Sequence, residues 1–347
     1  MWANRESAMN DTLDNHQRSM LNGLSAKFID RVHNRRGDEA WIRSLLLDAS
    51  TLFVPVWQGR QLFDGGDTPH PVLLRGRDIS NLGLSVEGAV FLGLDKGKAY
   101  FALDLTEPGA PDPPEGMDAR GEFRDLRAMS PLLEPEESGL LAYARAITYW
   151  HQRHRFCGDC GSPTVSSCGG HVRLCTSKDC GRHIFPRTDP AVIVLVASED
   201  SCLLGRQPSW PERRYSVIAG FVEPGEALED AVVREVFEET GVRVRTIHYH
   251  SSQPWPFPCS IMLGFRARAE RGPIRLGDGE LEDARWYSRT ELRSEVELGK
   301  LLLPPPISIA YRLLESWYDE GGTARLRDLG SSSWVPLPER PWGKTSP

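Results

Sequence analysis

The segment from Gly220 to Val242 holds the densest group of residues that could do chemistry, and most of them are glutamates. A glycine-rich turn opens the segment, and Gly241 stands where glycine usually follows the last turn of a helix. At helical spacing, Glu235 and Glu239 project within the arc that should face a core. The apolar members of that arc are Leu228, Ala231, Val232 and Val236. The periodicity therefore places two carboxylates among apolar side chains.

These two carboxylates, with Glu238 beside them, would repel one another and lose hydration unless a cation lies among them. Because clustered oxygens are hard ligands, the sequence predicts Mg²⁺ or Mn²⁺ at this point. Arg234 precedes Glu238 by one helical turn and can hold it in place. The alternative is a solvated glutamate-rich helix that binds no metal.

A second group of potential ligands is formed by four of the seven cysteines, which occur as two close pairs. They are Cys157, Cys160, Cys175 and Cys180. Two thiolate pairs joined by a hairpin suit a tetrahedral Zn²⁺ ion, and a filled ligand set makes such a site structural. The second pair has the wider spacing, and Cys168 and His171 lie between the pairs as possible substitutes. The sequence thus predicts one structural zinc per chain and leaves the ligand set open.

The N-terminal half contains patterns that predict strands and a helix. Short apolar runs at 51–56, 89–94 and 99–104 predict a small domain that contains a sheet. The segment 107–122 has the composition of a linker or a long loop, and we expect it to be mobile. From Gly139 to His154, apolar residues recur at helical spacing and predict a helix that leads into the cysteines.

The C-terminal half alternates strands and helices. A continuous β-branched run at 191–197 is typical of a strand buried on both faces. Interleaved strands and helices predict a mixed α/β sandwich around it. Further strands are expected at 201–206, 215–219, 243–250 and 260–269, and a closing helix near 305–318.

The composition limits the partners and the compartment. A formal charge of −7 argues against a broad surface for duplex nucleic acid, so any RNA would be bound locally, near one end. No apolar run approaches the roughly 18 residues of a membrane span, and the first 35 residues lack a signal-peptide core. The last residues, Thr345-Ser346-Pro347, do not match the peroxisomal signal. A cytoplasmic location is expected, with no membrane partner.

The glutamate segment resembles the signature of the Nudix hydrolases at every fixed position. The matching residues are Gly220, Glu226, Arg234, Glu235, Val236, Glu238, Glu239, Gly241 and Val242. The stretch Ser252-Gln-Pro-Trp-Pro-Phe-Pro258 is similar to the motif that separates NADH pyrophosphatases, which include NAD-capped RNA hydrolases, from other Nudix enzymes. The cysteine pairs and the stretches 186–190 and 280–286 fit the same subfamily.

The resemblance implies an α+β fold, in which a Nudix α/β/α sandwich with a mixed sheet follows a zinc ribbon and a smaller sheet-containing N-terminal domain. The implied domains are 1–125, N-terminal NADH-pyrophosphatase-like domain; 126–154, connecting helical segment; 155–186, zinc ribbon; 187–320, Nudix hydrolase domain; and 321–347, C-terminal tail.

The resemblance also implies roles for individual residues. Glu235, Glu238 and Glu239 ligate Mg²⁺ or Mn²⁺, and Glu238 also assists or acts as the general base. Glu280 adds a carboxylate and Ala219 a backbone carbonyl to the metal shell, whereas Glu226 organises the loop. Phe221 and Phe185 stack on substrate rings, Ala310 contributes backbone, and Arg127 reaches a phosphate. The remaining pocket residues are Gln253, Pro254, Trp255, Pro256, Phe257, Pro258, Cys259 and Ser260.

From the residues alone, Trp255 and Phe257 form a rigid aromatic wall suited to a planar ring, because the flanking prolines fix the backbone. Core packing is the alternative role for these rings and for Phe221.

The implied function is metal-dependent hydrolysis of the pyrophosphate bond of NADH or NAD to nicotinamide mononucleotide and AMP. RNA with a 5′ NAD cap is a second expected substrate, and the expected assembly is a homodimer to whose sites Phe185 contributes across the interface. One alternative is a Nudix hydrolase for another nucleoside diphosphate derivative, such as ADP-ribose. The other is a zinc-ribbon binding module with an inert Nudix signature.

Overall fold

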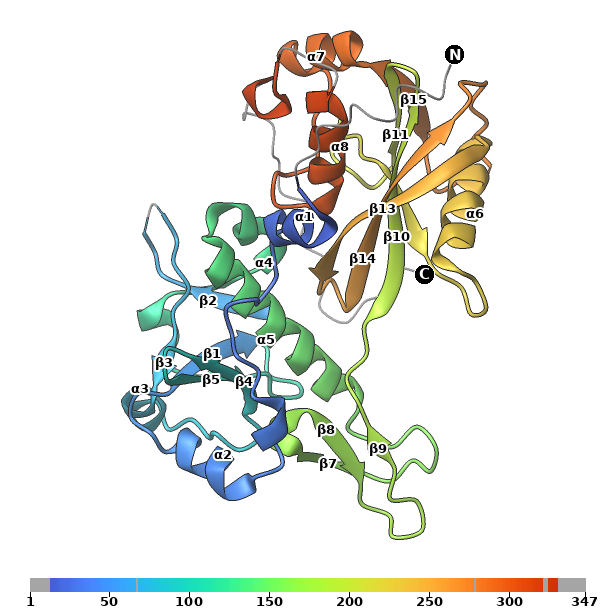
Figure 1. Ribbon diagram of the computed structural model, residues 1–347. Coiled ribbons are helices and arrows are strands. Elements are labelled where there is room, and N and C mark those ends of the chain that lie inside the picture. The colour runs from blue at the N-terminus through green and yellow to red at the C-terminus, as the bar shows by residue number, and fades with distance from the viewer. Residues whose placement is uncertain (1–12, 67, 278, 321–323, 330–347) are drawn as a thin grey trace. The chain divides into compact units, whose positions relative to one another are not determined.

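The computed structural model describes residues 13–66, 68–277, 279–320 and 324–329, and they form two compact units (Figure 1). We call the first the glutamate unit; its described residues come from 13–23, 189–254 and 260–329. We call the second the cysteine unit; it comprises the described residues of 24–188 together with 255–259. Most of the C-terminal tail expected over 321–347, including its last three residues, lies outside the described residues.

The glutamate unit contains a mixed sheet in the order β13-β14-β10-β11-β15, with β12 also paired to β10. Strands β10 and β14 run parallel, whereas β11 and β12 are antiparallel to β10. The strands are β10 (Asp189–Ser198), β11 (Ser201–Arg206), β12 (Ile218–Phe221), β13 (Val244–Trp255), β14 (Ser260–Ala269) and β15 (Asp283–Ser288). The helices are α1 (Asn15–Leu21), α6 (Leu228–Thr240), α7 (Arg289–Glu297), α8 (Ile309–Glu320) and the short 3-10 helix Leu326–Leu329.

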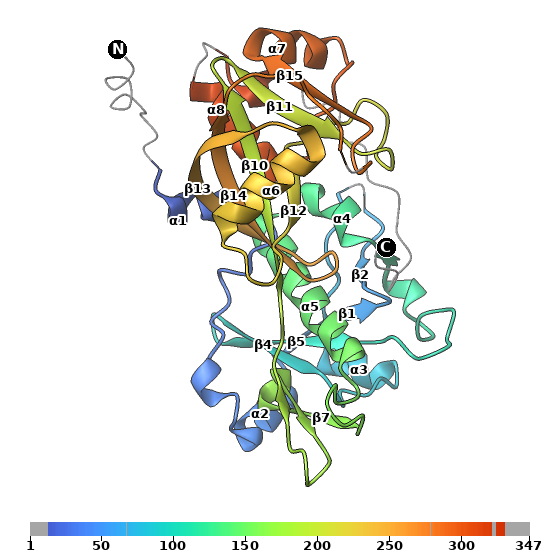
Figure 2. The ribbon, with the colours of Figure 1, turned by 90° about the vertical axis from the view of Figure 1, so that its right-hand side faces the viewer.

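Strand β10 lies at the centre of this unit and is buried on both faces, as the β-branched run predicts. Val192 and Val194 pack with Val232 and Val236 of α6, because alternate side chains of a strand point to one face. Ile193 belongs to the core on the other face, which includes side chains of α8. The two helices accordingly cover opposite faces of the sheet (Figures 1 and 2). The expected sandwich is confirmed.

Two expected elements of this unit are shorter than their patterns. The strand expected at 215–219 begins only at Ile218; Ser216 forms a single bridge to Gly205, and Tyr215 and Val217 are buried outside any strand. The helix expected near 305–318 begins at Ile309, since the prolines at 304–306 disfavour helical backbone before them.

The cysteine unit contains a second sheet in the order β4-β5-β1-β2-β6, with β3 also paired to β1. Its strands are β1 (Leu52–Trp57), β2 (Arg60–Phe63), β3 (Leu74–Arg75), β4 (Val90–Asp95), β5 (Lys98–Asp104) and β6 (Glu122–Arg124). Its helices are α2 (Glu39–Leu46), α3 (Gly76–Asn81), α4 (Leu126–Met129), α5 (Pro135–Arg153) and the 3-10 helices His33–Arg35, Asp118–Arg120, Ser130–Leu132 and Cys168–Gly170. A three-stranded sheet, β7 (Thr164–Ser167), β8 (Val172–Cys175) and β9 (His183–Ile184), carries the cysteines.

The segment expected to be a mobile linker or long loop is part of the cysteine unit. Met117 is fully buried in the same core as Phe101 and Leu103, and the segment runs directly into β6, which pairs with β2. It is therefore a long loop within that unit and not a linker between units, and its expected mobility stays a prediction. The five-part division of the chain stays a prediction.

Among the described residues, no helix has the length and apolar content that a membrane crossing requires.

Candidate active site and metal centre

Helix α6 carries the glutamates as the sequence predicts. It ends at Thr240, and Gly241 follows with a φ of 71°, the left-handed conformation that favours glycine. The apolar stripe is buried or packed against the core, and Glu239 is only 3% exposed among it. Burying a carboxylate costs free energy unless a hydrogen bond, an opposite charge or a metal ion compensates it.

Glu235 lies against the backbone of β12. A Cβ atom at Gly220 would overlap the Glu235 carboxylate, so only glycine leaves room for that group. Burial raises the pKa of Glu235; the ion pair with Arg234 opposes this shift, and the nearby Glu238 and Glu280 add to it. The structure therefore brings Glu280, which lies 45 residues later in the sequence, near the carboxylates of α6.

Arg234 links three of the glutamates. It donates hydrogen bonds at 2.6 Å to Glu226, 2.9 Å to Glu235 and 3.2 Å to Glu238. It also donates to the backbone carbonyl of Phe221 at 2.8 Å. The ion pair with Arg234 lowers the pKa of Glu226 to about 2, and Glu226 accepts a hydrogen bond from the backbone of its own loop. Arg234 thus fixes the loop and the helix in one network.

The donor set fits a hard divalent cation. Carboxylate oxygens and a backbone carbonyl, such as that of Ala219 beside Gly220, are the ligands that Mg²⁺ or Mn²⁺ prefers. Within the described residues, the glutamate oxygens do not gather as closely as the cysteine sulfurs do, since Arg234 draws three carboxylates toward itself.

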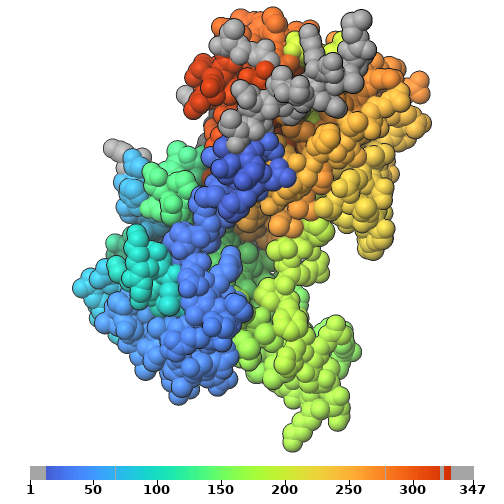
Figure 3. All heavy atoms as spheres, viewed as in Figure 1, coloured from blue at the N-terminus to red at the C-terminus, as the bar shows by residue number. Residues whose placement is uncertain are grey.

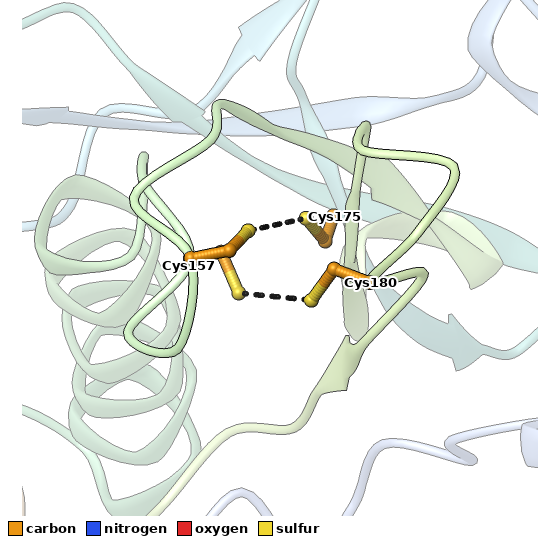
Figure 4. A group of neighbouring side chains, drawn as sticks. Cys157, Cys175 and Cys180 are labelled. Carbon is orange, nitrogen blue, oxygen red and sulfur yellow. Dashed lines mark hydrogen bonds between the residues drawn. The ribbon is translucent and has the colours of Figure 1, made fainter.

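The four cysteines converge in the cysteine unit, and Figure 4 shows Cys157, Cys175 and Cys180 pointing toward one another. Their sulfur atoms all lie within 4.8 Å of one another, and two pairs are 3.8 Å and 3.4 Å apart, Cys157–Cys180 and Cys160–Cys175. Tetrahedral zinc with Zn–S bonds of about 2.3 Å requires sulfurs about 3.8 Å apart, so the arrangement fits zinc.

The two substitute ligands point elsewhere. His171 contacts the backbone carbonyl of Phe91 through Nε2 at 2.7 Å, and burial lowers its pKa to about 4. Cys168 accepts a hydrogen bond from Ser167. The four residues whose sulfur atoms converge are thus Cys157, Cys160, Cys175 and Cys180, and their role as the zinc ligands stays a prediction.

The aromatic segment 255–259 belongs to the cysteine unit. The rings of Trp255 and Phe257 meet edge to face at 5.2 Å. The guanidinium group of Arg127 lies 4.7 Å from the centre of the Phe257 ring and 6.0 Å from that of Trp255. The structure thus brings together three residues that the resemblance assigns to the substrate.

Arg145 is a residue that sequence reasoning missed. It lies on α5, is 8% exposed, and donates from Nε to the carbonyl of Pro256 at 2.9 Å. It also donates to the carbonyl of Gly59, and its guanidinium lies 5.1 Å from the Phe257 ring. The sequence feature that could have identified Arg145 is its position as an arginine on the apolar face of the predicted helix.

Gln253 is fully buried, and its amide group caps α8. Its oxygen accepts from the backbone of Ile309 at 2.8 Å, and its nitrogen donates to the carbonyls of Gly23 and Ile307. Ala310 follows in the first turn of α8 and is also buried. The side chain of Gln253 therefore stabilises the start of α8, and its role in substrate binding stays a prediction.

The two remaining rings are on the surface of their units. Phe221 is 59% exposed at the end of β12, and Phe185 is 62% exposed after β9. Core packing as the alternative role of Phe221 is wrong, because its ring does not contribute to a core.

Comparison with known proteins agrees with this geometry. Residues 187–303 match the NUDIX domain profile, and residues 152–185 match the NADH pyrophosphatase zinc ribbon domain. Residues 50–150 match the NADH pyrophosphatase-like rudimentary NUDIX domain.

Full-length relatives show the same relationship. The chain is 38% identical over 279 residues to the Mycobacterium bovis protein named NAD-capped RNA hydrolase NudC, covering 75% of this chain and 87% of the relative. It is 43% identical over 196 residues to human NAD-capped RNA hydrolase NUDT12, covering 53% of this chain. The chain spans only 42% of the length of that human protein. The chain belongs to the Nudix hydrolase family, in the group with the NADH pyrophosphatase zinc ribbon.

Proposed function

We propose that the protein hydrolyses the pyrophosphate bond of NADH-type dinucleotides and removes NAD caps from RNA 5′ ends. The observation that carries this proposal is the carboxylate group of Glu235, held against Gly220 with Glu238 and Glu280 nearby and Glu239 buried on the same helix. The names of the Mycobacterium and human relatives support the choice of substrate.

In the proposed mechanism, Glu235, Glu239, Glu280 and the carbonyl of Ala219 hold the metal. Bound Mg²⁺ or Mn²⁺ supplies neutralisation of the pyrophosphate oxygens and a lower pKa for the attacking water. Glu238, half-exposed and held by Arg234, accepts the proton of the water as it attacks one phosphorus. The bond from that phosphorus to the bridging oxygen breaks, and nicotinamide mononucleotide and AMP leave without any redox change.

Substrate recognition is proposed to come from exposed or half-buried rings. Phe221 and Phe185 offer free ring faces, and Trp255 and Phe257 form the aromatic wall. Arg127 lies beside this wall, and its proposed role is to bind a phosphate of the ligand. From Gln253 to Ser260, the contribution that we propose is mainly backbone and ring surface.

The zinc of the four-cysteine site is proposed to be structural, because all four positions of a tetrahedral shell are supplied by the chain. A homodimer with Phe185 at the interface and a cytoplasmic location stay predictions. Sedimentation that finds a fully active monomer would exclude the first.

The test is to separate by chromatography the products formed from NADH, NAD⁺, ADP-ribose, FAD and a NAD-capped RNA in the presence of Mg²⁺ or Mn²⁺. We expect nicotinamide mononucleotide and AMP from NADH, and 5′-monophosphate RNA from the capped RNA. Glu239→Gln should lower kcat by orders of magnitude and leave the protein folded, since the change also relieves carboxylate repulsion. Full activity of this variant would refute the mechanism.

The same assay compares NADH with the alternative substrate ADP-ribose, which lacks the second aromatic ring. Stacking is worth about 1–3 kcal/mol per ring, so Phe221→Ala should lower kcat/KM for NADH by about tenfold to a hundredfold. The value for ADP-ribose should change little. Equal losses on both substrates would refute the stacking role of Phe221.

A further inference from the structure

A surface cavity of about 570 Å³ lies on the outer side of α6, in the glutamate unit. It is lined by Val233, Arg234, Phe237, Arg243, Val244, Arg245, Glu270, Arg271 and Gly272. Its walls are α6, the start of β13 and the residues that follow β14. The yellow helix α6 forms part of the surface in Figure 3. This volume is within the range of roughly 300–1,000 Å³ that is typical of ligand pockets.

The charges of the cavity are opposite to those of the chain as a whole. Three arginines besides Arg234, namely Arg243, Arg245 and Arg271, face one glutamate, Glu270, in a chain of net charge −7. Arg245 and Glu270 form an ion pair at 2.7 Å, but both side chains are more than 60% exposed, so water screens the pair. The cavity therefore offers a local excess of guanidinium groups.

The cavity also exposes apolar surface that the core does not use. Val233 and Phe237 are each 43% exposed, although they lie on the helix that carries the glutamates. The guanidinium group of Arg243 lies 4.8 Å from the centre of the Phe237 ring. An exposed ring among arginines is the combination that binds single-stranded nucleic acid, where bases stack on rings and phosphates pair with cations.

Arg234 connects this cavity to the proposed active site. It lines the cavity, and its guanidinium group holds Glu226, Glu235 and Glu238. An RNA chain that continues from a NAD cap at those glutamates needs to pass only around one helix, about 10–12 Å wide, to reach the cavity.

We propose that this cavity binds the first nucleotides of the single-stranded RNA that follow the NAD cap. Phe237 provides the stacking surface, and Arg243 and Arg271 bind phosphates. The proposal rests on the proposed function for its capped substrate, but RNA binding itself requires no hydrolysis.

The first experiment measures, by fluorescence anisotropy, the binding of a ten-nucleotide single-stranded RNA with a 5′ monophosphate. Phe237→Ala should weaken binding by about tenfold, the lower part of the range for one stacked base. The double variant Arg243→Gln/Arg271→Gln should reduce the slope of log K against log salt by about 1.4, or about 0.7 per phosphate contact. Arg293→Gln, which removes an exposed arginine from α7, is the matched control and should change neither quantity.

The second experiment compares kcat/KM for NADH and for the same RNA carrying a NAD cap. The cavity variants should lower the value for capped RNA and leave that for NADH unchanged. If NADH is not cleaved at all, the proposed function fails, while the anisotropy experiment still tests the cavity.

Unchanged RNA binding in both Phe237→Ala and the double arginine variant would overturn the proposal. So would an equal loss in Arg293→Gln, because that outcome would mean non-specific attraction. Competition by a polyglutamate peptide as strong as that by RNA would also overturn it, in favour of an acidic protein partner.

Discussion

Replacing Gly220 with alanine would place a methyl group in the space that the Glu235 carboxylate occupies. Non-bonded carbon atoms are in contact at about 3.5–4.0 Å, so the carboxylate would have to move by more than about 1 Å. A misplacement of about 1 Å can cost roughly a hundredfold in rate, because the reacting groups leave their productive geometry. We therefore expect Gly220→Ala to lower kcat by about a hundredfold or more.

The fold should tolerate this change better than the activity does. Gly220 does not have a left-handed backbone, so alanine can adopt its conformation and gains about 0.4–1 kcal/mol from the unfolded state. Overpacking costs about 1–3 kcal/mol in return, so the free energy of unfolding should fall by roughly 2.6 kcal/mol at most.

The assay measures kcat at saturating NADH and the concentration of Mg²⁺ or Mn²⁺ that gives half-maximal activity. In Gly220→Ala this metal concentration should rise. Denaturant unfolding gives the stability. Gly37→Ala is the matched control, since a Cβ atom there meets nothing within 4 Å. A Gly220→Ala enzyme with normal kcat would refute the argument that Glu235 must lie where it does.

Three other predictions address the cysteine unit. Arg145→Met should raise KM for NADH by about tenfold with little change in kcat, because the aromatic segment loses a buried charged donor worth about 1.5–3 kcal/mol; Arg145→Lys should restore part of this, and an equal effect on ADP-ribose would mean a purely structural role. Cys175→Ser should reduce the zinc content below one per chain and lower the free energy of unfolding by several kcal/mol, whereas Cys168→Ser should retain zinc; unchanged zinc in the first variant would contradict the site. Burial lowers the pKa of His151 and His171 to about 4, so both are neutral in the folded state and stability should be lost as the pH falls from 6.5 toward 4. At pH 5 the loss is about 1–2 kcal/mol per histidine, and His151→Gln should show a flatter pH dependence than the unchanged protein.

The repeat of apolar residues was sufficient to predict burial where a side chain's position depends only on its place in a helix or strand. The stripe on α6 and the alternation of Val192 and Ile193 between two cores follow from helical and strand repeats alone. Gly241 was predictable for the same reason, because a left-handed residue after a helix favours glycine in any fold.

Tertiary contacts decided the rest. Nothing near Met117 in sequence marks it as buried, and its neighbours have the composition of a linker. The sequence signature shows that a glycine is required at Gly220. The physical reason is visible only in the structure, where a Cβ atom at this position would overlap the carboxylate of Glu235. The strand expected at 215–219 failed because apolar residues are buried there without the pairing of a strand.

The aromatic segment 255–259 shows what local composition can and cannot predict. Its prolines predict a stiff backbone, and its rings predict a wall, but neither tells which part of the chain supports it. Its flanking residues belong to the glutamate unit, whereas the segment itself belongs to the cysteine unit. There it is held by Arg145, 111 residues earlier in the sequence, and faced by Arg127. The N-terminal half therefore supplies the buried cation, Arg145, that fixes the aromatic segment. A substitution at Arg145 should change the recognition of NADH although it leaves every glutamate in place.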